Sequence, residues 1–426
     1  MRDIALTLVF VVVMGYALRR HFALPLVWVW LSLMNPHRLA FGFAYSFPFA
    51  QISAITALLV LPFSKSRHGI PFSVRPVQWL AVFYIWMCIS SLASFNDSAE
   101  VFEMWVKVTK VQLMVWVGMM LLRGRQQIDM LVWTMALSIG FYGIKGGIFT
   151  ILKGGTSMVM GPAGTFIEGT NDIAMAMTMV VPLFYYLATT LERKSLRILI
   201  YVGMGLTTLS VLGTTSRGAL LAVCAMAAFL GFKSGRPVVT TLISLVGLAL
   251  LTTLMSDHWA DKMGSIATYQ DHSAQSRIYT WQMIWNMVQH HPWTGGGFLV
   301  TENPLTWQAY AVTEYLKAYS PHSIYFQALA EHGFPGLLIY LALGFSTYRL
   351  SNRVIIRARR QDLEWAASLM GMVQASLIAF AVGGAFVNLV NFDLPYYLLV
   401  VVVLTDQAVK SEQKSGEVAS ATSQAT

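Results

Sequence analysis

The sequence is poor in charged residues and in cysteine. Only 12% of its 426 residues are Asp, Glu, Lys or Arg, which is about half the share found in soluble domains. Hydrophobic residues make up 56%. This balance excludes an ordinary soluble domain and indicates a polytopic membrane protein. Two cysteines, Cys88 and Cys224, lie in apolar segments, where free buried thiols are expected.

Other absences exclude whole classes of function. The net charge is +9, but the basic residues are dispersed in short loops between apolar runs, so no nucleic-acid partner is predicted. The histidines match no compact metal-ligand spacing, so neither a metal nor another cofactor is predicted. No cleavable signal peptide is predicted, because the first apolar run ends in Arg19-Arg20-His21 without small residues.

What the sequence has in abundance is apolar segments. A spanning helix needs about 20 apolar residues. Thirteen candidates lie at 4–18, 22–34, 41–63, 77–94, 105–122, 129–151, 173–190, 196–214, 217–232, 237–255, 335–350, 366–387 and 394–408. The first two and the last are short. The sequence therefore predicts an all-α protein with 12 or 13 transmembrane helices, and no repeat of fixed period is visible.

The basic residues predict the orientation. One set of alternate loops holds 19 of the 29 Lys and Arg residues, which places that set in the cytoplasm by the positive-inside rule. The long polar loop 256–334 then faces the opposite side. We expect an N-terminal membrane region at 1–165 and a second membrane domain at 166–410 that contains this loop. The tail, 411–426, is too poor in apolar residues to order itself.

The loop contains a predicted amphipathic helix at 273–288. Ser273 or Ser276 can cap it, and Arg277 lies near its start. Its apolar stripe consists of Trp281, Ile284, Trp285 and Val288. This pattern is typical of a helix lying in the membrane interface. Arg277 is then either a solvated charge on the polar face or part of a site.

Arg217 lies in Gly213-Thr-Thr-Ser-Arg-Gly218, between two apolar segments. A charge at membrane depth costs about 2.5–3.5 kcal/mol on insertion scales and is usually functional. The alternative is an arginine that only snorkels to the interface, which its place on the side with fewer basic residues disfavours. A guanidinium group can donate two parallel hydrogen bonds to a diphosphate.

His322 lies in Tyr319-Ser-Pro-His-Ser-Ile-Tyr-Phe-Gln327. Ser320 is a candidate N-cap and Pro321 a first helical residue, which places His322 in the first turn. A helix N-terminus disfavours a positive charge, so we expect a neutral imidazole that can accept a proton from a hydroxyl. The alternative is an interfacial histidine with a satisfied hydrogen bond. Asn171, just before an apolar helix, either caps that helix or lines the site.

Three patterns together resemble the O-antigen ligase and polymerase superfamily of bacterial envelope proteins. They are Thr215-Ser-Arg-Gly218, Ser276-Arg277 with the later His291-Pro-Trp-Thr-Gly-Gly-Gly297, and Pro321-His322-Ser-Ile-Tyr-Phe-Gln327. The similarity covers about residues 165–400. The stretches Trp30–Ala40 and Gly42–Gln51 also resemble a subgroup labelled O-glycosylation ligases.

The resemblance implies an enzyme of the bacterial inner membrane that works without a metal. Members transfer a glycan from undecaprenyl diphosphate to an acceptor hydroxyl on the periplasmic side. Arg217 and Arg277 would bind the donor diphosphate, and His322 would act at the reacting centre of an inverting transfer. Further substrate contacts are expected from Asn171, Tyr325 and Gln327. The acceptor is lipid A-core, as in lipopolysaccharide biosynthesis, or a protein.

Two alternatives stay open. One is another transferase of the same superfamily, an O-antigen polymerase or a protein O-oligosaccharyltransferase. The other is a lipid or polysaccharide transporter that uses the arginines to hold an anionic lipid. A transporter favours inverted repeats, which are not evident in the sequence.

Overall fold

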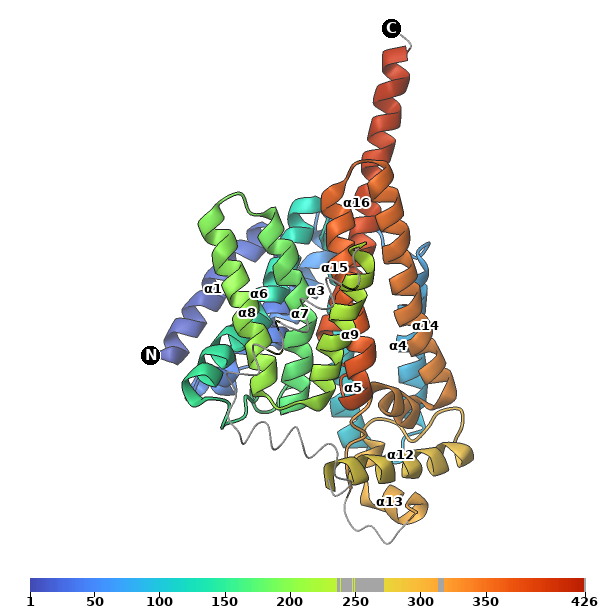
Figure 1. The fold of residues 1–426 in the computed structure, drawn as a ribbon. Helices are drawn as coiled ribbons and strands as arrows, with labels where there is room; N and C mark the ends of the chain where they lie inside the picture. The colour runs from blue at the N-terminus through green and yellow to red at the C-terminus, as the bar shows by residue number, and fades with distance from the viewer. Residues whose placement is uncertain (236–237, 239–246, 248, 250–271, 313–317, 425–426) are drawn as a thin grey trace.

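The computed structural model describes residues 1–235, 238, 247, 249, 272–312 and 318–424. Throughout these residues the regular elements are helices (Figure 1), which confirms the predicted all-α class. The α-helices are α1 (Arg2–Arg19), α2 (Ala23–Met34), α3 (Phe49–Val60), α4 (Arg75–Leu92), α5 (Ser98–Leu121), α6 (Gly124–Lys153), α7 (Thr170–Thr190), α8 (Lys194–Gly213), α9 (Arg217–Lys233), α12 (His272–His290), α13 (Pro304–Tyr310), α14 (Ile324–Arg360), α15 (Glu364–Gly383) and α16 (Asp393–Gln424). Short 3-10 helices are η1 (Pro36–Leu39), η2 (Phe43–Tyr45), η3 (Leu61–Phe63), η5 (Val300–Glu302) and η6 (Gly384–Phe386).

Each apolar segment predicted within the described residues coincides with one of these helices. The segment 237–255 lies almost wholly outside the described residues. In the part of the chain that the structure describes, six helices are long and apolar enough to cross a membrane by length and composition, namely α5, α6, α7, α8, α14 and α15, the last extended through η6. The chain is therefore a multi-pass membrane protein, and the number 12 or 13 stays a prediction.

The helices form a bundle with α16 in its interior. α6 packs on α8, α14 packs on α4 and α15, and α15 packs on α7 and α9. Residues 396–406 of α16 are all buried, as expected for a helix that is apolar around its whole circumference. The polar tail 411–426 was expected to be disordered, whereas α16 continues as helix to Gln424. Once a helix is nucleated, each added residue gains a hydrogen bond, and Ala, Glu, Gln and Lys tolerate helix well.

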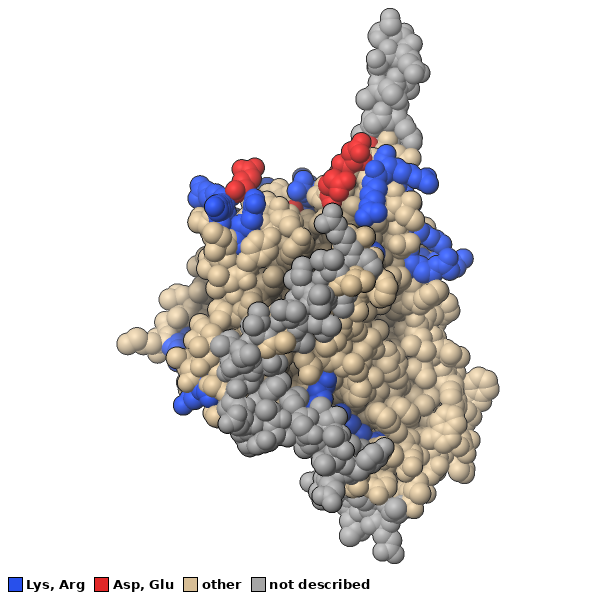
Figure 2. Space-filling model, in the orientation of Figure 1, with Lys and Arg blue, Asp and Glu red and all other residues tan. Residues whose placement is uncertain are grey.

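The two ends of the bundle differ. α12 and α13 lie across one end, and α16 leaves at the opposite end, beside the α7–α8 and α14–α15 connections (Figure 1). On the face in Figure 2, most exposed charged side chains lie at the α16 end. We call α12 and α13 together the polar layer. It lies at the end of the protein opposite the connections that are predicted to be cytoplasmic.

A second, smaller core joins α12 and α13 to α14. Its buried members include Met283, Ile284, Met287 and Val288 of α12. Two residues of the predicted stripe, Ile284 and Val288, are buried as expected, whereas Trp285 is 49% exposed. Ser276 lies inside α12 rather than at its start, so its predicted capping role is wrong. The alternative cap, Ser273, stays a prediction, because its side chain lies outside the part that the structure describes.

Candidate functional site at the polar end of the bundle

The turn before α14 carries His322. α14 begins at Ile324, and its N-cap Ser323 accepts a hydrogen bond from the Phe326 backbone N–H at 3.5 Å. The predicted cap at Ser320 and helix start at Pro321 are therefore wrong. Ile324, which follows the observed cap, is buried.

His322 has an unusual backbone conformation. Its φ of 44° lies in the left-handed region, which costs a residue with a Cβ about 1–2 kcal/mol. Thr215, two residues before α9, has a φ of 56°. Left-handed residues thus precede both α9, which begins at Arg217, and α14, which begins two residues after His322. Strained backbone of this kind is concentrated at functional sites.

The His322 side chain is half-buried beside a cation. Burial, followed by the positive charge of Arg277, lowers the pKa of His322 from 6.5 to about 4. The imidazole is therefore neutral near pH 7, as the sequence predicts. The cause differs from the prediction, because desolvation and Arg277 act here rather than the helix N-terminus.

Arg277 of α12 acts electrostatically on two groups from other parts of the chain. These groups are the imidazole of His322 and the carboxyl group of Asp172. Asp172 lies in the first turn of α7 and accepts a hydrogen bond from the backbone of Asn388. Arg277 is therefore within electrostatic range of the start of α7 and of the turn before α14.

Trp281 fixes α12 in this position. Its indole N–H donates to the Pro321 carbonyl oxygen at 2.8 Å, and its ring stacks on Phe326 with centroids 4.9 Å apart and planes 4° apart. Because residues four apart share a helix face, Arg277 is directed toward the same turn. This contact couples the arginine to the segment that holds His322.

Arg217 begins α9 on the other side of η6. Ser216 caps α9 by accepting a hydrogen bond from the Ala219 N–H at 3.3 Å. A Cβ on Gly218 would lie 2.6 Å from Phe386 of η6, so the start of α9 touches η6 directly.

The same 3-10 helix touches the start of α14. A Cβ on Gly384 would lie 2.4 Å from the Ile324 side chain. The first turns of α9 and α14 therefore both contact η6. Arg217 and His322 thus lie at the same end of the bundle. Figure 2 shows exposed Lys and Arg atoms in the lower half of this face, where Figure 1 shows α9 approaching α12.

Asn171 and Tyr325 also lie at this end. α7 begins at Thr170 with Gly169 as its N-cap, so Asn171 is in the first turn and does not cap the helix. Tyr325 is half-buried and donates its hydroxyl to the Ala381 carbonyl oxygen at 2.5 Å. Both side chains border the region between α7, α14 and α15.

Gln327 lies deeper. Its side chain is 7% exposed; Nε2 donates to Glu331 Oε1 at 3.2 Å, and Oε1 accepts from the Val390 N–H at 3.3 Å. The side chain thus connects α14 to the buried segment before α16. Its observed contacts are internal, and they support the turn above them.

From the sequence, Asp172, next to Asn171, is a candidate helix cap or a residue lining the site, whereas sequence reasoning missed Glu331 and Asn391 beneath the site. Glu331 lies against Asn391 and is buried. The available signal was a carboxyl group inside or next to an apolar segment, which is costly unless it has partners. Among the described residues, no group of three His, Cys, Asp or Glu side chains is arranged to hold a metal ion.

An apolar groove starts at the site. It has a volume of about 470 Å³ and lies between α14, α15 and α16, and Ile324 and Tyr325, which follow His322 in the chain, belong to its lining.

Two parts of the chain match known protein families. Residues 202–341 match the family described as O-Antigen ligase, a range that includes Arg217, Arg277 and His322. Residues 1–192 match a family of unknown function, DUF5935. No curated protein matches the chain.

Proposed function

Because the chain belongs to the O-antigen ligase superfamily, we propose that it transfers a glycan from undecaprenyl diphosphate to an acceptor hydroxyl at the periplasmic membrane surface. The observation that carries this proposal is that Arg277 acts electrostatically on His322 from a helix that Trp281 joins to the turn before α14 by a 2.8 Å hydrogen bond to the Pro321 carbonyl oxygen. A cation beside a neutral imidazole at the mouth of an apolar groove suits a lipid diphosphate and a hydroxyl nucleophile.

The donor is held by charge at one end and by apolar contact at the other. Arg217 and Arg277 bind the diphosphate, since each guanidinium group can donate two parallel hydrogen bonds to phosphate oxygens. The polyprenyl chain lies in the groove that begins at Ile324 and Tyr325. Asn171, in the first turn of α7, contacts the sugar in this proposal.

The reaction breaks the bond between the anomeric carbon and the diphosphate oxygen. The acceptor oxygen attacks from the opposite face, and its proton passes to the neutral imidazole of His322. The bond electrons leave with the diphosphate, and the two arginines stabilise the negative charge that develops there. The anomeric centre is inverted, and the products are the glycosylated acceptor and undecaprenyl diphosphate.

Lipid A-core is the acceptor that we propose, with a protein hydroxyl or a second lipid-linked glycan as the alternatives within the superfamily. The test uses purified protein in liposomes with a lipid-linked glycan as the donor. Lipid A-core, an acceptor peptide and a second lipid-linked glycan are supplied in separate reactions. A covalent product only with lipid A-core supports the ligase, and movement of the donor without any covalent product would show a transporter instead.

A further inference from the structure

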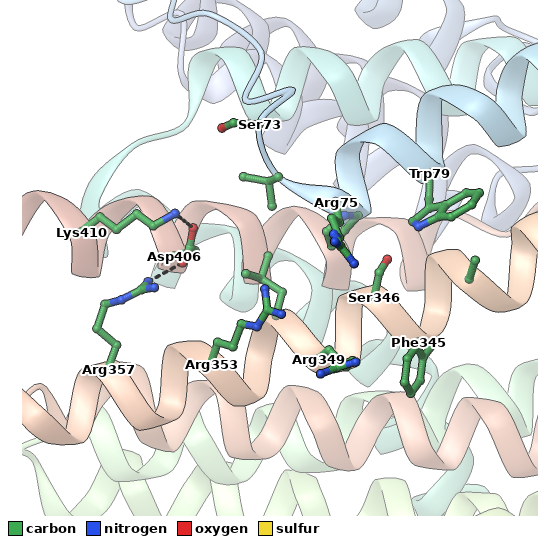
Figure 3. A pocket seen from close by; sticks show the side chains of 14 residues that line it. Ser73, Arg75, Trp79, Phe345, Ser346, Arg349, Arg353, Arg357, Asp406 and Lys410 are labelled. Carbon is green, nitrogen blue, oxygen red and sulfur yellow. Dashed lines mark hydrogen bonds and ion pairs between the residues drawn. The ribbon is translucent and has the colours of Figure 1, made fainter.

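A second polar cavity lies at the end of the bundle opposite the candidate site. It has a volume of about 420 Å³ and is formed by the start of α4, the second half of α14 and the C-terminal part of α16 (Figure 3). Five basic residues and one acidic residue line it, namely Arg75, Arg349, Arg353, Arg357, Lys410 and Asp406. The cavity therefore carries an excess of positive charge.

Asp406 neutralises only one edge of this cavity. Its carboxylate is buried and lies 2.6 Å from both the Arg357 guanidinium group and the Lys410 ammonium group. Within the described part of the chain, no carboxylate lies within 4.0 Å of the side-chain nitrogens of Arg75, Arg349 or Arg353. Three cations thus face the cavity without an acidic partner there.

The arrangement is costly without a counter-anion. Arg349, Arg353 and Arg357 are spaced four residues apart, so they share one face of α14, and like charges at this spacing repel. In Figure 3, Arg353 and Arg75 extend from different helices toward the same space. Arginine pairs of this kind favour a phosphate group, whose oxygens accept from several guanidinium groups.

The other wall of the cavity is apolar. Trp79 of α4 and Phe345 of α14 line the part that is farther from Asp406 and Lys410 (Figure 3), and Ala342 and Leu350 of α14 also belong to the lining. Phe345 is 62% exposed, and the Arg349 guanidinium carbon lies 5.6 Å from the centre of its ring. A soluble phosphate would use only the polar half, whereas a phospholipid would use both.

We propose that this cavity binds the headgroup of an anionic phospholipid. Arg75, Arg349 and Arg353 hold its phosphate, and its acyl chains run along Trp79 and Phe345. Basic pockets between transmembrane helices near the cytoplasmic surface are suited to such headgroups. The bound lipid links α4 to α14 and offsets the repulsion along α14. This site stands independently of the transferase reaction.

The test measures lipid binding to the purified full-length protein in neutral detergent. Phosphatidylglycerol, phosphatidylcholine with the same acyl chains, and inorganic phosphate are titrated separately. Bound lipids are counted by native mass spectrometry, and thermal stability is recorded in parallel. Wild-type protein should retain phosphatidylglycerol in preference to phosphatidylcholine, and its Tm should rise with phosphatidylglycerol.

The Arg349→Gln/Arg353→Gln variant should bind phosphatidylglycerol about 30-fold more weakly, since each basic residue near an anionic lipid surface contributes about fivefold. The single Arg353→Gln variant should show a smaller loss. Without lipid, the double variant should be at least as stable as the wild type, because the repulsion along α14 is reduced.

The matched control is Arg193→Gln/Arg360→Gln, which removes the same charge from exposed positions at the ends of α8 and α14. It should keep wild-type binding. An equal loss in both double variants would mean that general surface charge attracts the lipid, and the site would be rejected. A Tm increase with inorganic phosphate but not with phosphatidylglycerol would also overturn the lipid as occupant.

Discussion

At the scale of single residues, His322 combines a left-handed backbone with a neutral, half-buried side chain. The backbone and the imidazole can be tested separately. Gly adopts φ > 0 freely and Asn tolerates it, so both substitutions keep the turn while removing the base. Ala removes the base and adds strain.

His322→Ala, His322→Asn and His322→Gly should each reduce turnover by about 10²–10⁴-fold, the usual contribution of a general base. Their stabilities should differ, with Tm highest for Gly and lowest for Ala. Steady-state transfer assays and thermal unfolding of the same preparations provide the comparison. Near-normal ligation by His322→Asn would exclude the role of base.

The pKa of His322 predicts the acid limit of the reaction. The neutral imidazole is the active form, so kcat/KM in the free enzyme should persist as pH falls and decline near pH 4. Arg277→Gln removes one cause of the low pKa and leaves burial. The decline should therefore move upward, toward the ordinary value of 6.5, as the pKa rises.

Normalised pH profiles of the wild type and Arg277→Gln measure this shift, with Arg360→Gln as a control for loss of a distant positive charge. The control should keep the wild-type profile. If the acid limit of Arg277→Gln stays at the wild-type pH, Arg277 does not lower the pKa of the group that limits the reaction, and its proposed interaction with His322 is wrong.

At the scale of elements, Gly333 determines the shape of α14. Its φ of 68° and ψ of −172° interrupt the helix, and a Cβ there would lie 2.2 Å from the Trp293 carbonyl oxygen. The loop before α13 bonds into this kink, because the Phe334 N–H donates to the Pro292 carbonyl oxygen at 2.9 Å. The polar layer is thus attached to α14 through its bend.

Gly333→Ala should destabilise the protein by about 1–3 kcal/mol, the usual cost of a strained backbone, and detach the layer that holds Arg277. Gly344→Ala on the same helix is the control. Nothing lies within 4 Å of a Cβ at Gly344, so we expect a gain of about 0.4–1 kcal/mol. Thermal unfolding measures both effects, and a neutral Gly333→Ala would contradict the attachment.

The sequence predicted the helices better than their ends. Apolar runs indicated where the spanning helices lie, because burial in lipid or protein selects for them. The ends depend on contacts made elsewhere in the chain. The run 335–350 lies inside α14, which extends well beyond it on both sides. The predicted cap was Ser320, whereas Ser323 caps the helix and the next residue, Ile324, packs against η6.

At the scale of the whole molecule, the candidate site depends on long-range packing that no local pattern encodes. The motifs predict a site made of Arg217, Arg277 and His322. Their common end of the bundle follows from η6, which touches both α9 and α14, and from the contact of Trp281 with Pro321. The electrostatic interaction of Asp172 with Arg277 could not be predicted, because only the folded chain brings α7 near α12.

The same scale carries a prediction about orientation. If the basic end is cytoplasmic by the positive-inside rule, α13 should be accessible from the periplasm. Leu305 of α13 is 69% exposed, and Arg193 lies in the connection between α7 and α8 at the opposite end. In a background with Cys88→Ser and Cys224→Ser, a membrane-impermeant maleimide that enters only the periplasm should label the Leu305→Cys variant in intact cells. The Arg193→Cys variant should react only after the membrane is permeabilised. The reverse pattern would place Arg217 and Arg277 on the cytoplasmic side and the proposed phospholipid cavity on the periplasmic side. A periplasmic transfer reaction would then be impossible at this site.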